Sequence, residues 1–190
     1  MNLPNILTIA RIFLTIFFIG VIQQEGFAAK VVGAALFAVA SLTDFFDGYL
    51  AKTRNLITDF GKIMDPIADK FLMLSAFYIF MKLDVIAVWM FVVIAVREIG
   101  ITAWRLLAMR SGKVFAAESL GKYKTVSQIA AIGVILMFMI VVETQNGHNL
   151  NETTLRVWNQ CIYGLMLAAV GLTLVSGVFY IWKNRGHLNG

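Results

Sequence analysis

Four aspartates are spaced so that they could bind divalent metal ions. Asp44 and Asp47 lie three residues apart, and Asp65 and Asp69 lie four residues apart, in segments that are otherwise largely apolar. On a helix, each spacing places both carboxylates on one face. Carboxylate oxygens suit hard cations such as Mg²⁺, Mn²⁺ and Ca²⁺, and four carboxylates suffice for a pair of ions. The pattern therefore predicts a two-metal site.

A short connector places the two pairs of aspartates within reach of one another. About ten residues join the two acidic segments, and connectors of this length join antiparallel neighbouring helices. Each charge costs about 2.5–3.5 kcal/mol at the centre of a bilayer, and mutual repulsion among the carboxylates adds to this cost. Positive charge must compensate. The alternative to metal ions is a set of structural ion pairs with Arg11, Lys70 or Arg97.

The elements that position these residues are expected to be membrane-spanning helices. Of the 190 residues, 59% are hydrophobic and 14% are charged, and the mean hydropathy is +0.79, which is far above the values typical of a soluble domain. Apolar runs of about 20 residues recur, and each matches the thickness of the hydrocarbon core. We expect an all-α polytopic membrane protein with six transmembrane helices and a polar active-site cavity that faces the cytoplasm. The spans are expected at roughly 5–22, 31–51, 62–81, 85–106, 123–142 and 157–182.

The six spans form one expected domain, residues 1–190, because no repeat or linker divides the chain. The first span is expected to be retained, since the N-terminus lacks the basic region and cleavage site of a signal peptide. Pro66 is expected near the first turn of the third span, where proline is tolerated. The segment 143–156 is expected to be a polar connector.

Basic residues predict the orientation of these spans. They are more frequent after the second and fourth spans and in the tail than on the opposite side, so the positive-inside rule places both termini and the site in the cytoplasm of a bacterial cell. The residues compared are Lys52, Arg54, Arg110, Lys113, Lys183 and Arg185 on one side and Lys30, Lys82 and Arg156 on the other. The net charge of +5 favours anionic lipid or a phosphorylated substrate, and no nucleic-acid partner is expected.

Cysteine and histidine chemistry is not expected. Cys161 is the only cysteine, so no intramolecular disulfide can form, and it lies in an apolar stretch where packing is the simplest role. His148 lies in a polar connector and His187 in the C-terminal tail, and neither has a partner nearby in sequence. We assign no role to either histidine.

The acidic segments resemble a known family motif. CDP-alcohol phosphatidyltransferases carry D-x-x-D-G-x-x-A-R, eight residues, and then G-x-x-x-D-x-x-x-D. The chain reads "DFFDGYLAK", "TRNLITDF" and "GKIMDPIAD" over residues 44–69, so every spacing and seven of the eight fixed residues match. The one departure is Lys52, where the family has arginine; lysine keeps the charge but lacks the planar fork that binds phosphate through two hydrogen bonds.

The resemblance implies a reaction and a cofactor. The family transfers a phosphatidyl group from a CDP-linked lipid, here CDP-diacylglycerol, to an alcohol, with release of CMP. By this resemblance two divalent cations, Mg²⁺ or Mn²⁺, are held by Asp44, Asp47, Asp65 and Asp69, and Asp69 is also the general base. The residues implied to bind the CDP-lipid are Gly48, Ala51, Lys52 and Gly61. A homodimer among membrane lipids is expected because members of the family commonly form one.

Four basic residues predict the kind of alcohol that is accepted. Arg97 and Arg105 are eight residues apart, and therefore about 80° apart on a helix, while Lys122 and Lys124 open the next span. Cations near a carboxylate site suggest an anionic acceptor, most simply a phosphate monoester. The segments "NLPNILTIARI", "REIGITAWRLLA" and "SLGKYKT" further resemble the bacterial branch of the family whose acceptor is glycerol 3-phosphate.

Simpler roles for these basic residues stay open at this point. Lys122 and Lys124 could anchor a helix at the membrane surface, and Arg97 could pair locally with Glu98 or a nearby aspartate. Arg11, inside the first span, either lines the same cavity or extends toward the membrane surface.

Two other functions compete with this interpretation. A related enzyme could use another acceptor; inositol phosphate would suit the cations, whereas serine would leave them poorly explained. A cation transporter could also use acids within the membrane as its ion site. Against a transporter, the spans lack internal repeats, and a conducting pore has no use for lysines beside its cation site.

Overall fold

The expected all-helical architecture is confirmed. A computed structural model describes residues 3–53, 59–110, 119–144 and 151–184, although the side chains of residues 3–4, 44–53, 59–60, 62, 109–110, 119–120 and 184 lie outside this description. The described part of the chain forms six helices and no strand. They are α1 (Leu3–Ile22), α2 (Phe27–Thr53), α3 (Asp59–Lys82), α4 (Val88–Arg110), α5 (Ser119–Thr144) and α6 (Glu152–Asn184).

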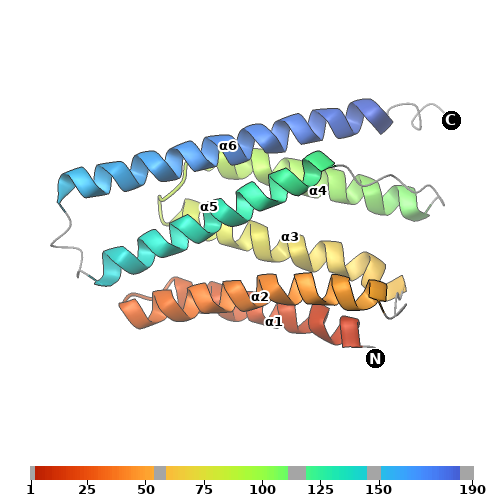
Figure 1. The fold of residues 1–190 in the computed structure, drawn as a ribbon, viewed down its shortest axis with the longest axis horizontal. Coiled ribbons are helices and arrows are strands. Elements are labelled where there is room, and N and C mark those ends of the chain that lie inside the picture. The colour runs from red at the N-terminus through yellow and green to blue at the C-terminus, as the bar shows by residue number, and fades with distance from the viewer. Residues whose placement is uncertain (1–2, 54–58, 111–118, 145–150, 185–190) are drawn as a thin grey trace.

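The helices form an elongated bundle in which α3 has a central place. Figure 1 shows α1 and α2 side by side along one edge, α6 along the opposite edge, and α3, α4 and α5 between them. Consecutive helices alternate in direction, so α1 begins and α6 ends at the end of the bundle where α2 ends and α3 begins. Helix α3 packs against α1, α2, α4 and α5. The predicted acidic residues therefore lie on two neighbouring helices at one end of the molecule.

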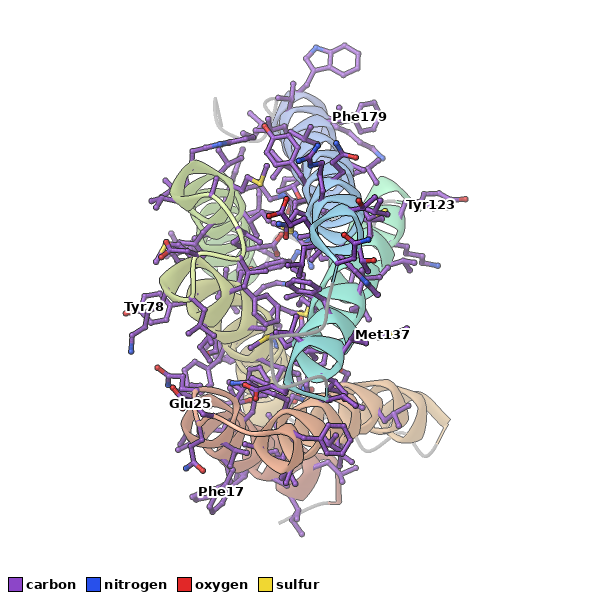
Figure 2. The ribbon with its side chains drawn as sticks, turned by 90° about the vertical axis from the view of Figure 1, so that its left-hand side faces the viewer. Phe17, Glu25, Tyr78, Tyr123, Met137 and Phe179 are labelled. Carbon is purple, nitrogen blue, oxygen red and sulfur yellow. The ribbon has the colours of Figure 1, made fainter. Side chains whose placement is uncertain are left out.

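Large apolar side chains fill the bundle and also cover it. Phe18, Phe77 and Phe80 are fully buried in the core, together with residues from α4, α5 and α6. Figure 2 shows other large side chains, including Phe17 and Phe179, pointing away from the helices on opposite sides. A water-exposed surface would not carry so much apolar area, whereas lipid solvates it without cost.

Within the described ranges, three helices are long and apolar enough to cross a membrane by length and composition alone. They are the segments Asn5–Ile22, Gly121–Thr144 and Glu152–Lys183, and the apolar part of α2, Phe27–Thr43, is shorter. Helices α3 and α4 are comparable in length but carry charged residues in their middle turns. The residues that could do chemistry are also those that make these two helices less apolar.

Several helix ends differ from the predicted spans. Helix α4 begins three residues later than expected, because Asp84 adopts a φ of 56° and the amide of Val85 bonds to the carbonyl of Phe80. Helix α6 begins well inside the expected connector, where Asn151 Oδ1 accepts a hydrogen bond from the Thr153 amide at 3.4 Å. Such caps depend on local hydrogen bonds and not on hydropathy.

Pro66 also differs from expectation. It lies inside α3, two turns after the first residue of the helix, and not in the first turn. A proline there lacks the amide that would bond to the carbonyl four residues earlier. The missing bond lies in the turn that precedes Pro66, and Pro66 itself lines the cavity described below, between Asp65 and Asp69 in the chain.

Candidate active site

Asp65 and Asp69 of α3 line one wall of a cavity of about 230 Å³. Pro66 and Lys70 lie beside them, and Thr102, Arg105 and Leu106 of α4 form the facing wall. The two aspartates are one helical turn apart, which places both carboxylates on the face that α3 turns toward α4. The sequence predicted this shared face, and the structure adds that α4 closes it.

A residue of α1 orients Asp65. The hydroxyl of Thr8 donates a hydrogen bond to Asp65 Oδ1 at 2.5 Å, and Thr8 is fully buried. A hydrogen bond that fixes a carboxylate also fixes the direction in which its other oxygen can bind a ligand. Thr8 was not predicted from the sequence; the available signal was a polar residue one turn before Arg11 in an otherwise apolar helix.

Asp69 forms an ion pair with the next residue of α3. Lys70 Nζ lies 2.6 Å from Asp69 Oδ2, and the same ammonium lies 3.1 Å from Glu98 Oε2 of α4. The alternative that an aspartate pairs with Lys70 is therefore confirmed for Asp69. This pair does not replace the metal hypothesis, because a carboxylate has two oxygens and several lone-pair positions.

Glu98 is the centre of a buried charge cluster. Its side chain is fully buried, and its Oε1 accepts hydrogen bonds from Lys124 of α5 and, at 3.2 Å, from the Arg97 guanidinium. Gln128 Nε2 lies 3.5 Å from the same oxygen. One carboxylate thus faces three cations, counting Lys70, where burial makes an unpaired charge costly.

A second cavity, of about 590 Å³, carries the predicted basic residues. Arg97, Arg105, Lys122 and Lys124 all line it. The structure therefore brings these four residues together, while their binding of an acceptor stays a prediction. The other lining residues are Lys70, Ile101, Thr102, Gly121, Thr125, Val126, Ser176 and Tyr180.

The structure tests the simpler roles considered for the basic residues, which were anchoring at the membrane surface for Lys122 and Lys124 and local pairing for Arg97. Lys124 is only 2% exposed, so anchoring at the membrane surface is wrong for it, whereas Lys122 is exposed. Arg97 does pair with Glu98, as the local alternative required, and its Nη2 also donates to Ser176 Oγ at 3.1 Å. Arg105 is exposed and lies 5.7 Å from the ring centre of Tyr180, a distance typical of a cation–π contact.

Arg11 does not extend to the membrane surface. Its side chain in α1 is fully buried, on the same helix as Thr8. A long side chain that reached the surface would keep its guanidinium exposed. Of the two roles considered for Arg11, the structure supports a place inside the protein.

The remaining predicted residues lie largely outside the described side chains. Asp44, Asp47, Gly48, Ala51 and Lys52 belong to the last turns of α2, but their side chains are not described. Gly61 is buried near the start of α3. Among the described residues no group of three or more metal-ligating side chains converges, since only the α3 half of the predicted set is among them.

The two cavities share the side chains of Lys70, Thr102 and Arg105. The smaller, acidic cavity presents the carboxylates of Asp65 and Asp69. The larger, basic cavity presents a surplus of positive charge. The first suits a hard cation or a proton to be removed, and the second suits an anion such as phosphate. A molecule with a hydroxyl at one end and a phosphate at the other fits this arrangement.

Comparisons with known proteins agree with this chemistry. A family model described as CDP-alcohol phosphatidyltransferase matches residues 1–180. A CDP-diacylglycerol–glycerol-3-phosphate 3-phosphatidyltransferase of Bacillus subtilis is 38% identical, over 96% of this chain and 95% of that protein. A probable phosphatidylglycerophosphate synthase of Mycobacterium tuberculosis is 37% identical, over 100% of this chain and 84% of that protein.

A third relative is similar over a shorter stretch. It is a CDP-diacylglycerol–glycerol-3-phosphate 3-phosphatidyltransferase of Rickettsia felis, 39% identical over 72% of this chain and 75% of that protein. All three similarities extend well beyond the 26 residues of the acidic motif.

Proposed function

The chain belongs to the CDP-alcohol phosphatidyltransferase family, and from this premise we propose that it transfers the phosphatidyl group of CDP-diacylglycerol to glycerol 3-phosphate. The products are phosphatidylglycerophosphate and CMP. The relatives named above as enzymes of this reaction support the choice of acceptor. Family membership sets aside the cation transporter.

The observation that carries the proposal is the junction of the two cavities. Lys70, Thr102 and Arg105 line both, so a hydroxyl near Asp69 and a phosphate among the basic residues of the larger cavity can belong to one small molecule. Glycerol 3-phosphate has this form. Serine has no phosphate for the basic cavity, and inositol phosphate is the competing acceptor that the same residues would bind.

The reaction needs a base at the acceptor hydroxyl. The hydroxyl oxygen forms a bond to the lipid-side phosphorus, the bond from that phosphorus to the CMP oxygen breaks, and the hydroxyl proton passes to a carboxylate. We assign that proton to Asp69, which lines the acidic cavity and is held by the ammonium of Lys70. Positioned carboxylates commonly act in this way as general bases.

The oxygen donors of α3 support the proposal that the site holds two divalent cations. Asp65 and Asp69 offer only oxygen atoms to the acidic cavity, as Mg²⁺ and Mn²⁺ require, and the buried Thr8 fixes one of these carboxylates. We propose that Asp44 and Asp47 complete the set from α2. When bound, such ions neutralise a pyrophosphate and stabilise the departing CMP. Gly48, Ala51, Lys52 and Gly61 are proposed to contact the CDP-lipid.

The acceptor phosphate is proposed to bind among Arg97, Arg105, Lys122 and Lys124. Arg105 and Lys122 are exposed within the cavity, so they are the residues most accessible to a phosphate that enters from water. Arg97 and Lys124 are held deeper by Glu98. Charge-assisted hydrogen bonds to phosphate are roughly twice as strong as neutral ones.

The protein is an integral membrane protein, and we propose its orientation and assembly. The first residue of α1, the last residue of α6 and the site lie at one end of the bundle, which supports a common side for both termini and the site, and the distribution of basic residues favours the cytoplasmic side of a bacterial inner membrane. A homodimer is also proposed from the family resemblance. Cross-linking in native membranes tests the assembly, and labelling of cysteines introduced near the termini tests the side.

The direct test of the function is acceptor-dependent release of CMP. Purified protein is incubated with CDP-diacylglycerol and Mg²⁺ or Mn²⁺, and glycerol 3-phosphate, inositol phosphate, serine and phosphatidylglycerol are offered in turn. Release with glycerol 3-phosphate is expected. Release with inositol phosphate alone would correct the acceptor, and release with none of them would refute the reaction.

A further inference from the structure

Glu98 lies where the two cavities meet. Its Oε2 is 3.1 Å from the ammonium of Lys70, which lines both cavities, and its Oε1 faces Arg97 and Lys124 of the larger one. Glu98 itself is fully buried and lines neither cavity. Glu98 therefore contacts Lys70, Arg97 and Lys124, which line the larger cavity, but it cannot itself contact a molecule bound in either cavity.

The charge cluster around Glu98 has more positive than negative charges, whereas a structural ion pair has one of each. Lys70, Arg97 and Lys124 carry three positive charges on one buried carboxylate. Asp69 offsets one of them through Lys70. An ion pair that served stability alone would need one cation, because further buried cations raise the desolvation cost. A positive surplus held next to a cavity is suited to a bound anion.

We propose that Glu98 is a positioning residue for the acceptor, and that it acts through Lys70. By holding the ammonium of Lys70 between Asp69 and the basic cavity, Glu98 sets the distance between the base and the acceptor phosphate. This inference rests on the proposed function and deepens it, since it assigns Lys70 a contact with the acceptor. Neither residue belongs to the family motif matched above, which ends at Asp69.

The position of Lys70 supports this role. A small acceptor with its hydroxyl at Asp69 and its phosphate in the larger cavity spans the junction of the two cavities, and Lys70 lines that junction beside Asp69. Lysine has a flexible stem, so its ammonium stays in place only if partners on both sides hold it. The 2.6 Å contact with Asp69 is one partner, and Glu98 is the other.

The first experiment compares Glu98→Gln with Glu143→Gln. Glu143 accepts a hydrogen bond from the backbone amide of Gly26 and lies 3.8 Å from the ammonium of Lys30, but it lines neither cavity and lies at the other end of α5 from Lys124. For Glu98→Gln we expect the KM for glycerol 3-phosphate to rise about tenfold or more, with the KM for CDP-diacylglycerol changed less than about twofold. Both KM values should stay near wild type in Glu143→Gln. An equal effect of Glu98→Gln on both substrates would overturn the proposal.

The second experiment tests whether Glu98 acts through Lys70. Lys70→Gln leaves Glu98 paired with Arg97 and Lys124, so this variant is expected to fold even if Glu98→Gln does not. It should raise the acceptor KM by a similar factor, and the double variant should cost little more than either single one. An unchanged acceptor KM in Lys70→Gln, or additive effects in the double variant, would refute the proposal.

A third measurement separates this inference from the proposed reaction. Glycerol 3-phosphate is added to purified wild type and to Lys70→Gln without metal or CDP-lipid, and thermal stability is followed. Binding to the folded state raises the melting temperature. Protection of wild type that is weaker in Lys70→Gln supports the positioning role even if no CMP is released. Equal protection of both proteins would contradict it, even in an active enzyme.

Discussion

Thr8 and Asp65, 57 residues apart in the chain, meet through a hydrogen bond of 2.5 Å between the hydroxyl of Thr8 and Oδ1 of the aspartate. The bond connects α1 to the acidic wall of α3, and Thr8 is fully buried. It gives the first helix a part in the site, although α1 contributes none of the residues in the family motif.

Replacing Thr8 by valine should impair catalysis more than folding. Valine keeps the shape but cannot donate to Asp65, and loss of a hydrogen bond that orients a metal ligand typically costs about 10–100-fold in metal affinity or activity. CMP release is measured across a range of Mg²⁺ concentrations, and a higher Mg²⁺ requirement is expected. Thr8→Ser, which keeps the hydroxyl, should stay close to wild type. A normal Mg²⁺ requirement in Thr8→Val would show that this hydrogen bond does not tune the site.

Asp69→Asn should abolish turnover and leave the fold intact. Asparagine preserves the shape and an oxygen for Lys70, but it cannot take a proton and is a weaker metal ligand, so a loss of about 10²–10⁴-fold is expected. The control is Asp84→Asn, in the turn between α3 and α4, where asparagine tolerates a φ of 56°. Melting curves and CMP release are measured for both variants. Near-normal turnover of Asp69→Asn would remove Asp69 from the mechanism.

Gly177→Ala should displace Arg97, which lines the basic cavity. A methyl group at Gly177 would lie 3.2 Å from Cγ of Arg97, which is tighter than ordinary contact, so the arginine must shift. A rise of a few-fold in the acceptor KM, about 2–5-fold, is expected from a displaced binding group. Gly171→Ala on the same helix is the matched control, since nothing lies within 4 Å of the added methyl group. The same kinetic constants in both variants would mean that the guanidinium of Arg97 does not contribute to binding.

Lys30→Met should weaken the fold at the end of the bundle opposite the site. The buried ammonium of Lys30 donates to the carbonyl of Ile22 at 3.0 Å and to that of Gln24 at 2.7 Å, which satisfies the C-terminal end of α1. Losing these bonds is expected to cost about 1–3 kcal/mol of unfolding free energy. Thermal unfolding in detergent measures the change, and KM values should not move. Lys82→Met, which removes one exposed hydrogen bond to Gln23, should cost less.

Lys52→Arg should improve use of the CDP-lipid. Arginine restores the motif residue and its planar fork, which binds pyrophosphate through paired hydrogen bonds. We expect the KM for CDP-diacylglycerol to fall about 2–10-fold while that for glycerol 3-phosphate is unchanged. Lys52→Gln should have the opposite effect on the lipid. If arginine and glutamine behave alike, position 52 does not contact the pyrophosphate.

The positions of the helices followed from the sequence more closely than their ends did. Long apolar runs predicted all six, because hydropathy is a property of composition that survives any packing arrangement. The start of α6 was misplaced because Asn151 caps it within a polar stretch that hydropathy assigns to a connector. The late start of α4 likewise depends on the left-handed conformation of Asp84.

The candidate site was predicted in part. Spacing alone indicated that Asp65 and Asp69 share a face, and the basic residues of α4 and α5 were expected near them. Lys70 was considered as an ion-pair partner of the aspartates and Glu98 as a partner of Arg97, but the contact between Lys70 and Glu98 was not predicted, because each residue has an ordinary explanation within its own helix. Only their meeting across α3 and α4, at 3.1 Å, gives them a common role.

The sequence by itself determined the class of the protein, its six helices and the motif that assigns its family, since each depends on residues close together in the chain. The tertiary structure decided which charges meet. Lys124 pairs with Glu98 across 26 residues, and Arg97 reaches Ser176 across 79. Such pairs depend on how helices rotate and shift against one another, and side-chain packing throughout the bundle sets that register.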